Sequence, residues 1–247
     1  MSSVIHCISD LHLTSKRNDL FLLFRKYMRE ISPLSQQLFV LGDLFDAWIG
    51  DDCLSLDSSE SEFYRMVVNE FSNYSNLGKD LFFIHGNRDF LLSSDFAKKA
   101  GGKILEEPYT FYLDNKKIAF IHGDILCTDD VEYIKFRQMV RAPLWQKEFL
   151  SKSIEERLIV ATQLREKSML AQKEKSSEIM DVNQNAVDEF IVENDLDWLI
   201  HGHTHRQNIH LEEIDNKKAK RIVLADWGEK GFYLSISKGK LEEKYFS

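Results

Sequence analysis

Side chains that can bind a metal ion recur in this sequence, each just after a short apolar run. Two of the pairs have the spacing Asp-x-His or His-x-His, and alternate residues of an extended segment face the same way. Carboxylate, imidazole and amide oxygen suit Mn, Fe, Zn or Mg, and the set offers no thiolate. The pattern predicts a metal site built from Asp10, His12, Asp43, Asn87, His122, His203 and His205.

Seven ligands are too many for one ion, but they fit two ions that share a bridging carboxylate. Asp43 is the best candidate for the bridge. Two ions about 4 Å apart hold the attacking and leaving oxygens of a displacement at phosphorus. They also stabilise the charge that develops on the phosphoryl oxygens. The sequence therefore predicts hydrolysis of a phosphoester or a phosphoanhydride.

The apolar runs that precede these residues have the length of strands and are bounded by Gly or polar residues. Uninterrupted runs are typical of strands buried on both faces. Helical periodicity separates them, and this alternation predicts an α/β fold with its site at the strand ends. The expected strands are 4–9, 38–41, 81–84, 118–121 and 198–200, and the expected helices are 19–31, 60–74 and 180–193.

Two regions depart from this alternation. Residues 221–225, 231–237 and 241–246 read as short strands in a meander, which predicts a second sheet. Residues 131–180 look helical and hold ten Lys and Arg against seven Asp and Glu, a net charge of +3, whereas the rest of the chain carries −11. We expect a single domain, 1–247, with a basic helical cap at about 131–180 on an acidic body.

Composition limits the function classes. The chain has 247 residues, 43% of them hydrophobic, so it can bury a core and is not expected to be disordered. A net charge of −8 gives no reason to expect nucleic acid as a partner. Cys7, Cys53 and Cys127 form no CxxC pair, which favours a reducing compartment. Neither a signal peptide nor an apolar run of about 18 residues is evident, so we expect a cytoplasmic protein.

The motifs taken together resemble those of the calcineurin-like metallophosphoesterases. They are DLH at 10–12, GDLFD at 42–46, GNRD at 86–89, HGD at 122–124 and GHTH at 202–205. The longer stretches 41–52, 83–92, 122–130 and 180–187 resemble one branch of that family, the UDP-2,3-diacylglucosamine hydrolases. The resemblance covers nearly the whole chain and is weakest at 143–179 and in the last thirty or so residues.

This resemblance implies a sandwich of two mixed sheets flanked by helices, in the order α/β/β/α, with a helical cap. It also implies Mn-dependent hydrolysis of the pyrophosphate of UDP-2,3-diacylglucosamine in lipid A biosynthesis. Attack at the α-phosphorus would release lipid X, which is 2,3-diacylglucosamine 1-phosphate, and UMP. One Mn would be held by Asp10, His12, Asp43 and His205, and the other by Asp43, Asn87, His122 and His203.

The catalytic residues implied are Asn87, Arg88 and His122. Many relatives have His where this chain has Arg88. An arginine can bind phosphate oxygens through its fork but cannot act as an acid. Since a nucleotide phosphate is a good leaving group, Arg88 favours a pyrophosphate over an alkyl phosphate ester as the substrate.

The resemblance further implies that the cap binds the lipid part of the substrate. Substrate contacts are expected at Asn87, Arg88, Asp130, Ser168, Gln172, Lys175 and His203. Gln172 departs from the family pattern, which has Asn there. Basic residues of the cap could meet anionic headgroups, so we expect a monomer attached peripherally to the cytoplasmic face of the inner membrane. Acyl grooves could be lined by Leu144, Trp145, Phe149, Leu150, Ile154, Leu158, Ile159, Leu164, Met169 and Leu170.

Simpler interpretations apply to several neighbouring residues. We expect Asp46 and Asp89 to support the site without binding metal, and Phe45 and Trp48 to lie in the core. His6, His85, His201 and His210 are expected to pack or to form hydrogen bonds, and Lys147, Lys152 and Arg157 to face solvent. Another nucleotide diphosphate, a cyclic nucleotide or a phosphoprotein remains an alternative substrate, and a non-enzymatic binding scaffold is a third hypothesis.

Overall fold

The computed structural model describes residues 4–174, 179, 181–214 and 217–247, without the side chains of 167–174. Among these residues, strands form two sheets. In the first sheet β1 to β4 are parallel, and the C-terminal hairpin β10–β11 adds antiparallel to β1. Its strand order is β11 (Lys240–Phe246), β10 (Gly231–Ser237), β1 (Ile5–Ile8), β2 (Gln37–Leu41), β3 (Asp80–Ile84) and β4 (Lys103–Ile104).

The second sheet has a parallel centre and antiparallel edges. Strands β6, β7 and β9 are parallel, with β5 antiparallel to β6 and β8 antiparallel to β9. Its order is β5 (Tyr109–Leu113), β6 (Lys116–Phe120), β7 (Trp198–His201), β9 (Lys217–Val223) and β8 (Asn208–Ile214).

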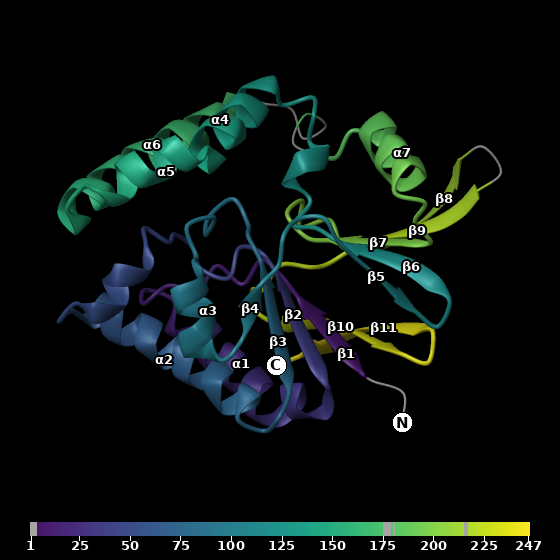
Figure 1. The fold of residues 1–247 in the computed structure, drawn as a ribbon, viewed down its shortest axis with the longest axis horizontal. Coiled ribbons are helices and arrows are strands. Elements are labelled where there is room, and N and C mark those ends of the chain that lie inside the picture. Colours follow the sequence, from purple (N-terminus) through teal and green to yellow (C-terminus); the bar gives the residue numbers. More distant parts are fainter. Residues whose placement is uncertain (1–3, 175–178, 180, 215–216) are drawn as a thin grey trace.

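Helices cover the outer face of each sheet (Figure 1). Helix α1 (Asn18–Lys26), which continues as a π-helix over Tyr27–Ile31, lies with α2 (Ser59–Ser75) and α3 (Ser94–Ala100) against the first sheet. Helix α7 (Gln184–Glu193) lies against the second. The α/β/β/α sandwich expected from the motifs is thus confirmed.

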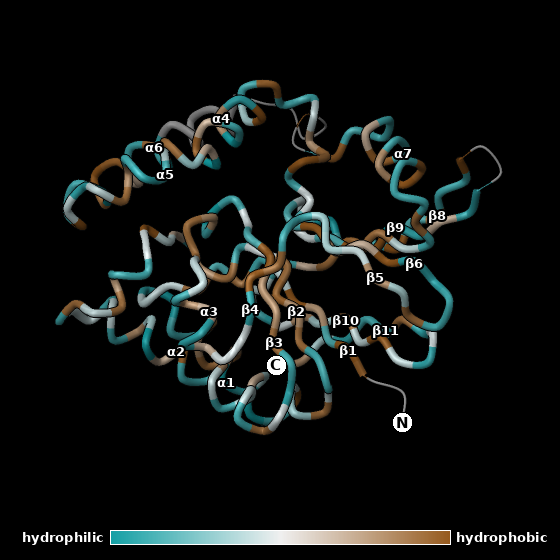
Figure 2. Tube along the Cα trace, in the orientation of Figure 1, coloured by the Kyte–Doolittle hydropathy of each residue, from teal (hydrophilic) through white to brown (hydrophobic). Residues whose placement is uncertain are grey.

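Three apolar clusters hold these four layers together. Phe24 of α1 and Phe71 of α2 pack on the first sheet, and Val187 of α7 packs on the second. Between the sheets, Phe39 of β2 stacks edge to face with Phe120 of β6, with ring centroids 4.7 Å apart. Figure 2 shows the hydrophobic segments concentrated along the strands of both sheets, as expected for strands with two buried faces.

The segment expected to form a cap contains three helices. They are α4 (Val131–Arg141), α5 (Pro143–Leu150) and α6 (Ile154–Glu174). The Asp130 carboxylate accepts from the N–H of Tyr133 and caps the start of α4, and Pro143 begins α5, where a missing N–H costs nothing. In Figure 1 the three helices lie beyond the carboxyl ends of the first sheet's strands.

The expectation of a C-terminal meander is wrong. After β9 the chain leaves the second sheet, and β10 pairs with β1 in the first sheet. The antiparallel partner of β9 is β8, an edge strand whose charged residues obscure its alternation. The sequence interpretation also missed β4, β5 and α3.

Candidate metal centre

The ends of β1, β2, β3, β6 and β7 bring all seven predicted metal ligands into one cluster. On one side the Nε2 atoms of His12 and His205 are 3.3 Å apart, and His205 Nε2 lies 3.2 Å from Asp10 Oδ1. Asp43 Oδ2 lies 3.9 Å from His12 Nδ1. Asp10, His12 and His205 can therefore offer ligand atoms to one ion.

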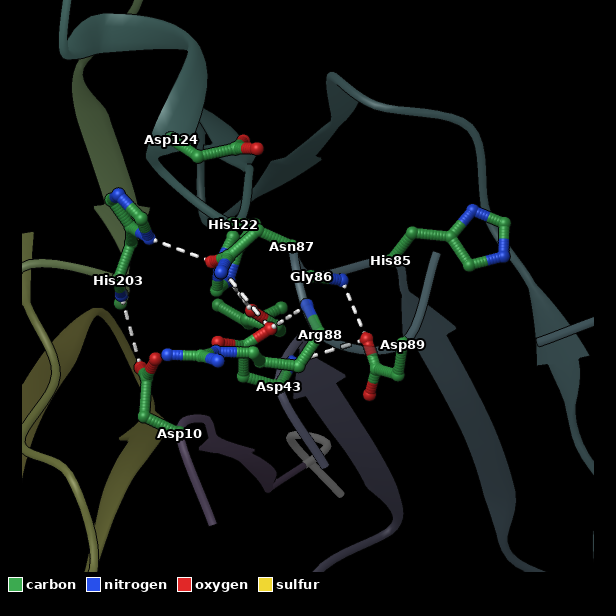
Figure 3. Close-up of polar contacts among 12 residues, drawn as sticks. Asp10, Asp43, His85, Gly86, Asn87, Arg88, Asp89, His122, Asp124 and His203 are labelled. Atoms are coloured by element: carbon green, nitrogen blue, oxygen red, sulfur yellow. Dashed lines mark hydrogen bonds and ion pairs between the residues drawn. The ribbon is translucent and has the colours of Figure 1, made fainter. Parts of the chain in front are cut away.

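The other side of the cluster is centred on Asn87. Its Oδ1 lies 2.9 Å from His122 Nε2 and 2.9 Å from His203 Nδ1. Asp43 Oδ1 lies 3.7 Å from His122 Nε2. Figure 3 shows these side chains converging from separate strand ends. Asp43 contacts both halves, as expected of a bridging carboxylate.

The electron-pair donors of this cluster fit divalent cations. His122 donates from Nδ1 to the carbonyl of Leu41 over 2.9 Å, so a neutral His122 presents the lone pair of Nε2 to the cluster. That lone pair faces the oxygens of Asn87 and Asp43. In that neutral form these donors would repel one another, and a shared cation would stabilise them in place of the proton that the nearby carboxylates otherwise favour on His122. The donor types are those of Mn, Fe, Zn or Mg.

The backbone holds five of the seven ligands in the left-handed region, namely Asp10, His12, Asp43, His203 and His205, with φ between 46° and 67°. Non-glycine residues adopt this conformation only when the surroundings enforce it. Adjacent glycines allow the close approach. A Cβ added to Gly86 would lie 2.1 Å from Asp43 Oδ1, and one added to Gly202 would lie 2.1 Å from Asp10 Oδ2.

Asp89 supports the ligands without joining them, as predicted. Its carboxylate accepts from the N–H groups of Gly86 over 2.8 Å, Leu44 over 2.7 Å and Asp43 over 3.3 Å. It is 1% exposed. Asp89 therefore links the loops after β2 and β3, which carry Asp43 and Asn87.

Burial and neighbouring charges set the protonation of the cluster. Burial lowers the pKa of His12 to about 4 and that of His203 to about 3, which leaves both imidazoles neutral at pH 7. Burial, together with Asp89 and Asp10 and against the pull of His122, raises the pKa of Asp43 to about 7. Crowding of buried carboxylates is the state that bound cations relieve.

The pKa values of two other residues of the cluster are shifted by neighbouring charged groups. Burial alone would lower the pKa of His122, but the carboxylates of Asp43, Asp10 and Asp124 raise it to about 9. Burial opposes ionisation of Asp10, yet its bond to His205 and the charge of His122 hold its pKa well below the usual range.

Arg88 extends toward the cluster in Figure 3. Its backbone N–H donates to Asp43 Oδ1 over 2.8 Å. Its side-chain Nε is buried and has no hydrogen-bond partner among the described residues. A buried donor without a partner costs about 1–3 kcal/mol, which an anionic ligand would offset.

An apolar cavity of about 270 Å³ opens beside Asn87 and Arg88. Of the residues predicted to line acyl grooves, the cavity is lined by Trp145, Phe149, Ile154, Leu158 and Leu164. Leu144, Leu150 and Ile159 are instead exposed. Phe45 and Trp48 are buried in the core as predicted, and Trp48 also lines this cavity.

The remaining predicted contacts are Asp130 in the cap and three residues whose side chains are not described. Asp130 sits at the N-terminus of α4, one turn before Tyr133. The predicted contacts Ser168, Gln172 and Lys175, together with Met169 and Leu170, lie outside the residues whose side chains the structure describes.

Three of the other histidines, His6, His85 and His201, form hydrogen bonds within the protein. His85 points away from the cluster in Figure 3, with its Nε2 2.7 Å from the carbonyl of Leu92. His201 is fully buried beside Gly202, and His6 lies 3.2 Å from the hydroxyl of Tyr27. His210 is on β8.

The expectation that Arg157 faces solvent is wrong. It is 4% exposed and donates to Asp52 Oδ1 over 2.7 Å and to the carbonyl of Ile49 over 2.9 Å. Asp46 likewise accepts from Arg165 over 2.8 Å, so it supports the position of α6. Lys147 is exposed, and Lys152 is partly so.

The sequence interpretation missed residues that connect the cap to the cluster. The ring of Tyr133 stacks on His203 with centroids 5.9 Å apart, and its hydroxyl donates to Asp124 over 2.6 Å. Glu107 accepts from the N–H of His122 over 2.6 Å and from Arg137 over 2.8 Å. Nothing in the sequence near Glu107 indicates this contact.

Asp226 was also missed, although its position carried a signal. It lies 3.5 Å from His205 Nδ1 and follows the apolar run Leu224-Ala225, the same strand-end pattern that identified the ligands.

Within the described residues, no helix is both long and apolar enough to cross a bilayer.

Comparison with known proteins agrees with this geometry. The chain is 42% identical to a UDP-2,3-diacylglucosamine hydrolase of Chromohalobacter salexigens, over 89% of this chain and 87% of that protein. Proteins of the same name from Serratia proteamaculans and Haemophilus influenzae are 37% and 42% identical, over 95% and 94% of this chain and 95% and 92% of theirs. The family model for calcineurin-like phosphoesterases matches residues 3–207. The chain is therefore a hydrolase that belongs to the calcineurin-like phosphoesterase family.

Proposed function

We propose that this chain hydrolyses the pyrophosphate bond of UDP-2,3-diacylglucosamine to 2,3-diacylglucosamine 1-phosphate and UMP, in lipid A biosynthesis. One observation carries the proposal. Asn87 belongs to the metal cluster and Arg88 lies beside it, and both also line the apolar cavity under the cap. A phosphorus compound that reacts at the cluster would thus place one substituent in apolar surroundings. The names of the three relatives support a diacylated substituent.

The seven-residue cluster would hold two Mn ions in this proposal. Asp10, His12, Asp43 and His205 would hold one, and Asp43, Asn87, His122 and His203 the other. When bound, the ions supply Lewis acidity at the phosphoryl oxygens and at the attacking water. The choice of Mn comes from the family resemblance.

Arg88 would bind the phosphoryl oxygens. Its unpartnered Nε is available for an anion, and its guanidinium keeps its charge throughout the reaction. A phosphate leaving group has a second pKa of about 6, so it departs as an anion at neutral pH without an acid. The oxygen of water bonds to the α-phosphorus as the bond to the bridging oxygen breaks. One hydrogen of the water stays on the new P–OH of UMP, and the other is released as a proton.

The proposal includes further substrate contacts and a location. Asp130 and His203, with Ser168, Gln172 and Lys175, would contact the glucosamine phosphate. The protein would act as a monomer on the cytoplasmic face of the inner membrane, where its lipid substrate resides. Exposed Leu144 and Ile159 of the cap support contact with a lipid surface.

The substrate is tested by assaying the purified, Mn-loaded protein on three compounds. They are UDP-2,3-diacylglucosamine, UDP-glucosamine without acyl chains, and a cyclic nucleotide. We expect turnover of the diacylated compound to exceed that of UDP-glucosamine by at least tenfold, because each buried CH₂ contributes about 0.8 kcal/mol. Turnover of the cyclic nucleotide alone would refute the proposal.

The metal centre is tested with Asp43→Ala. This variant should lose metal occupancy and activity together, with turnover at least about 100-fold lower, since even groups that only orient a ligand contribute 10- to 100-fold. Asp57→Ala is the matched control, because Asp57 is an exposed carboxylate that is not among the seven ligands. Unchanged turnover in Asp43→Ala would exclude the bridging role.

A further inference from the structure

A second cavity adjoins the metal cluster, on a wall that shares no residue with the apolar cavity. It has a volume of about 800 Å³, within the range of small-molecule sites. His205 lines this cavity, whereas Asn87 and Arg88 line the apolar one. The cluster is therefore bordered by an apolar cavity on one side and a polar cavity on the other.

Charge in this polar cavity is balanced. Its lining includes three Lys or Arg residues and three Asp or Glu residues. Arg206 pairs with Asp181, and Arg221 donates to Glu212 over 3.0 Å. A site whose formal charges balance and whose two arginines are paired disfavours a polyanion and suits a neutral, polar group.

Tyr245 and Asn208 give this cavity the features of a nucleobase site. Tyr245 is 53% exposed, and its hydroxyl donates to Gln207 Oε1 over 3.2 Å. Gln207 in turn donates to Glu243 over 2.6 Å, so the tyrosine is held in place. Asn208 Oδ1 accepts from the N–H of Ile209, and its amide nitrogen has no partner among the described residues. A flat ring beside an available donor suits a base that stacks and presents a carbonyl.

We propose that this polar cavity binds the nucleoside half of the substrate, with the Tyr245 ring stacked on the base and the Asn208 amide donating to a base carbonyl. The inference rests on the proposed function, which supplies a substrate with a lipid at one end and a nucleoside at the other. Uracil has two carbonyl acceptors. The reacting phosphorus would lie between the two cavities, at the cluster.

The base contact is tested by titrating Mn-loaded protein with UMP and with ribose 5-phosphate in a calorimeter. The two ligands share sugar and phosphate and differ by the base. We expect the intact protein to bind UMP at least tenfold more tightly. Tyr245→Ala should reduce that preference about tenfold, the effect of one lost base–aromatic contact, and Asn208→Ala should reduce it severalfold. Tyr245→Phe, which keeps the ring, should retain most of it.

The matched control is Tyr112→Ala, since Tyr112 is 72% exposed on β5 and does not line the cavity. It should leave the preference unchanged. Equal binding of UMP and ribose 5-phosphate by the intact protein would overturn the inference, as would an unchanged preference in Tyr245→Ala. A Tyr245-dependent preference for UMP in a protein that fails to hydrolyse the diacylated substrate would uphold this inference and refute the lipid part of the proposed function.

Discussion

The backbone around the ligands shows how individual residues are prepared for metal binding. Left-handed residues cost about 1–3 kcal/mol each when not glycine, and five ligands adopt this conformation. The cost is offset by hydrogen bonds between loops. Asp10 N–H donates to Gly42 over 3.1 Å, and His12 N–H donates to the carbonyl of Asp43 over 3.0 Å. Asp10 and His12 are thus held by the backbone of the loop that carries Asp43.

Asp89 is the residue on which this arrangement most depends, because it accepts three backbone N–H groups from two ligand loops. Asp89→Asn replaces one acceptor oxygen by a donor, which would face an N–H. We expect metal affinity to fall 10- to 100-fold, measured by calorimetry, with turnover largely restored at saturating Mn. Turnover that stays low at saturating Mn would contradict a purely supporting role.

The cap helices are anchored to the body by arginines. Arg137 and Arg141 of α4 pair with Asp124, and Arg157 and Arg165 of α6 pair with Asp52 and Asp46 respectively. The charge contrast between cap and body therefore helps to hold the cap on the body. Positive charge on the cap meets negative charge on the body, which leaves less of it to face a membrane.

Arg157 tests this anchoring. Arg157→Ala removes charge-assisted hydrogen bonds to Asp52 and Ile49, each worth about 1.5–3 kcal/mol, while the half-exposed Asp52 can return to water. We expect faster amide hydrogen exchange in α5 and at the start of α6, and a KM for the diacylated substrate raised severalfold.

Lys147→Ala is the control for this substitution, because Lys147 is exposed on the same cap. It should leave exchange and KM unchanged. Faster exchange throughout the two sheets of Arg157→Ala would indicate general unfolding and contradict a local role. No acceleration in the cap would show that Arg157 does not hold it.

The elements differ in how far the sequence predicts them. Buried parallel strands such as β2 and β7 are continuous apolar runs, so the strands and the ligands at their ends could be recognised locally. Strand β8 is an edge strand in which exposed and half-buried residues alternate irregularly, so its sequence shows no clear strand pattern. The crossing from β9 to β10 depends on pairing with β1, which is distant in the sequence. Arg157 and Asp52 are also distant in the sequence, so the sequence does not indicate that they pair.

At the scale of the molecule, the sandwich places chemically different surfaces around one reaction centre. The body supplies the ligands from strand ends of both sheets, and the cap and body together line the apolar cavity. The turn after β7 with the loop after β9 supplies much of the polar one. A substrate with a lipid, a pyrophosphate and a nucleoside in that order would match this sequence of surfaces. The seven ligands alone are compatible with many phosphorus substrates.

The exposed apolar side chains of the cap are relevant to where the protein would meet a lipid substrate. Leu144 is 79% exposed and Ile159 58%, and neither lines the apolar cavity. Because the cap arginines are paired with the body, apolar contact should contribute more to membrane binding than charge. Burying one Leu or Ile contributes about 1.5–3 kcal/mol. We therefore expect the protein to float with vesicles of phosphatidylethanolamine and phosphatidylglycerol, and to lose only part of this binding at high salt.

Leu144→Glu and Ile159→Glu should each reduce the membrane-bound fraction, with a partition coefficient about tenfold lower. Leu211→Glu is the matched control, since Leu211 is 74% exposed but lies on β8, away from the cap. Its partition coefficient should equal that of the unchanged protein, because β8 is not expected to touch lipid. An equal loss in all three variants would show that the cap is not the docking surface. Complete release by salt, with no effect of the cap substitutions, would show that charge alone holds the protein on the vesicles.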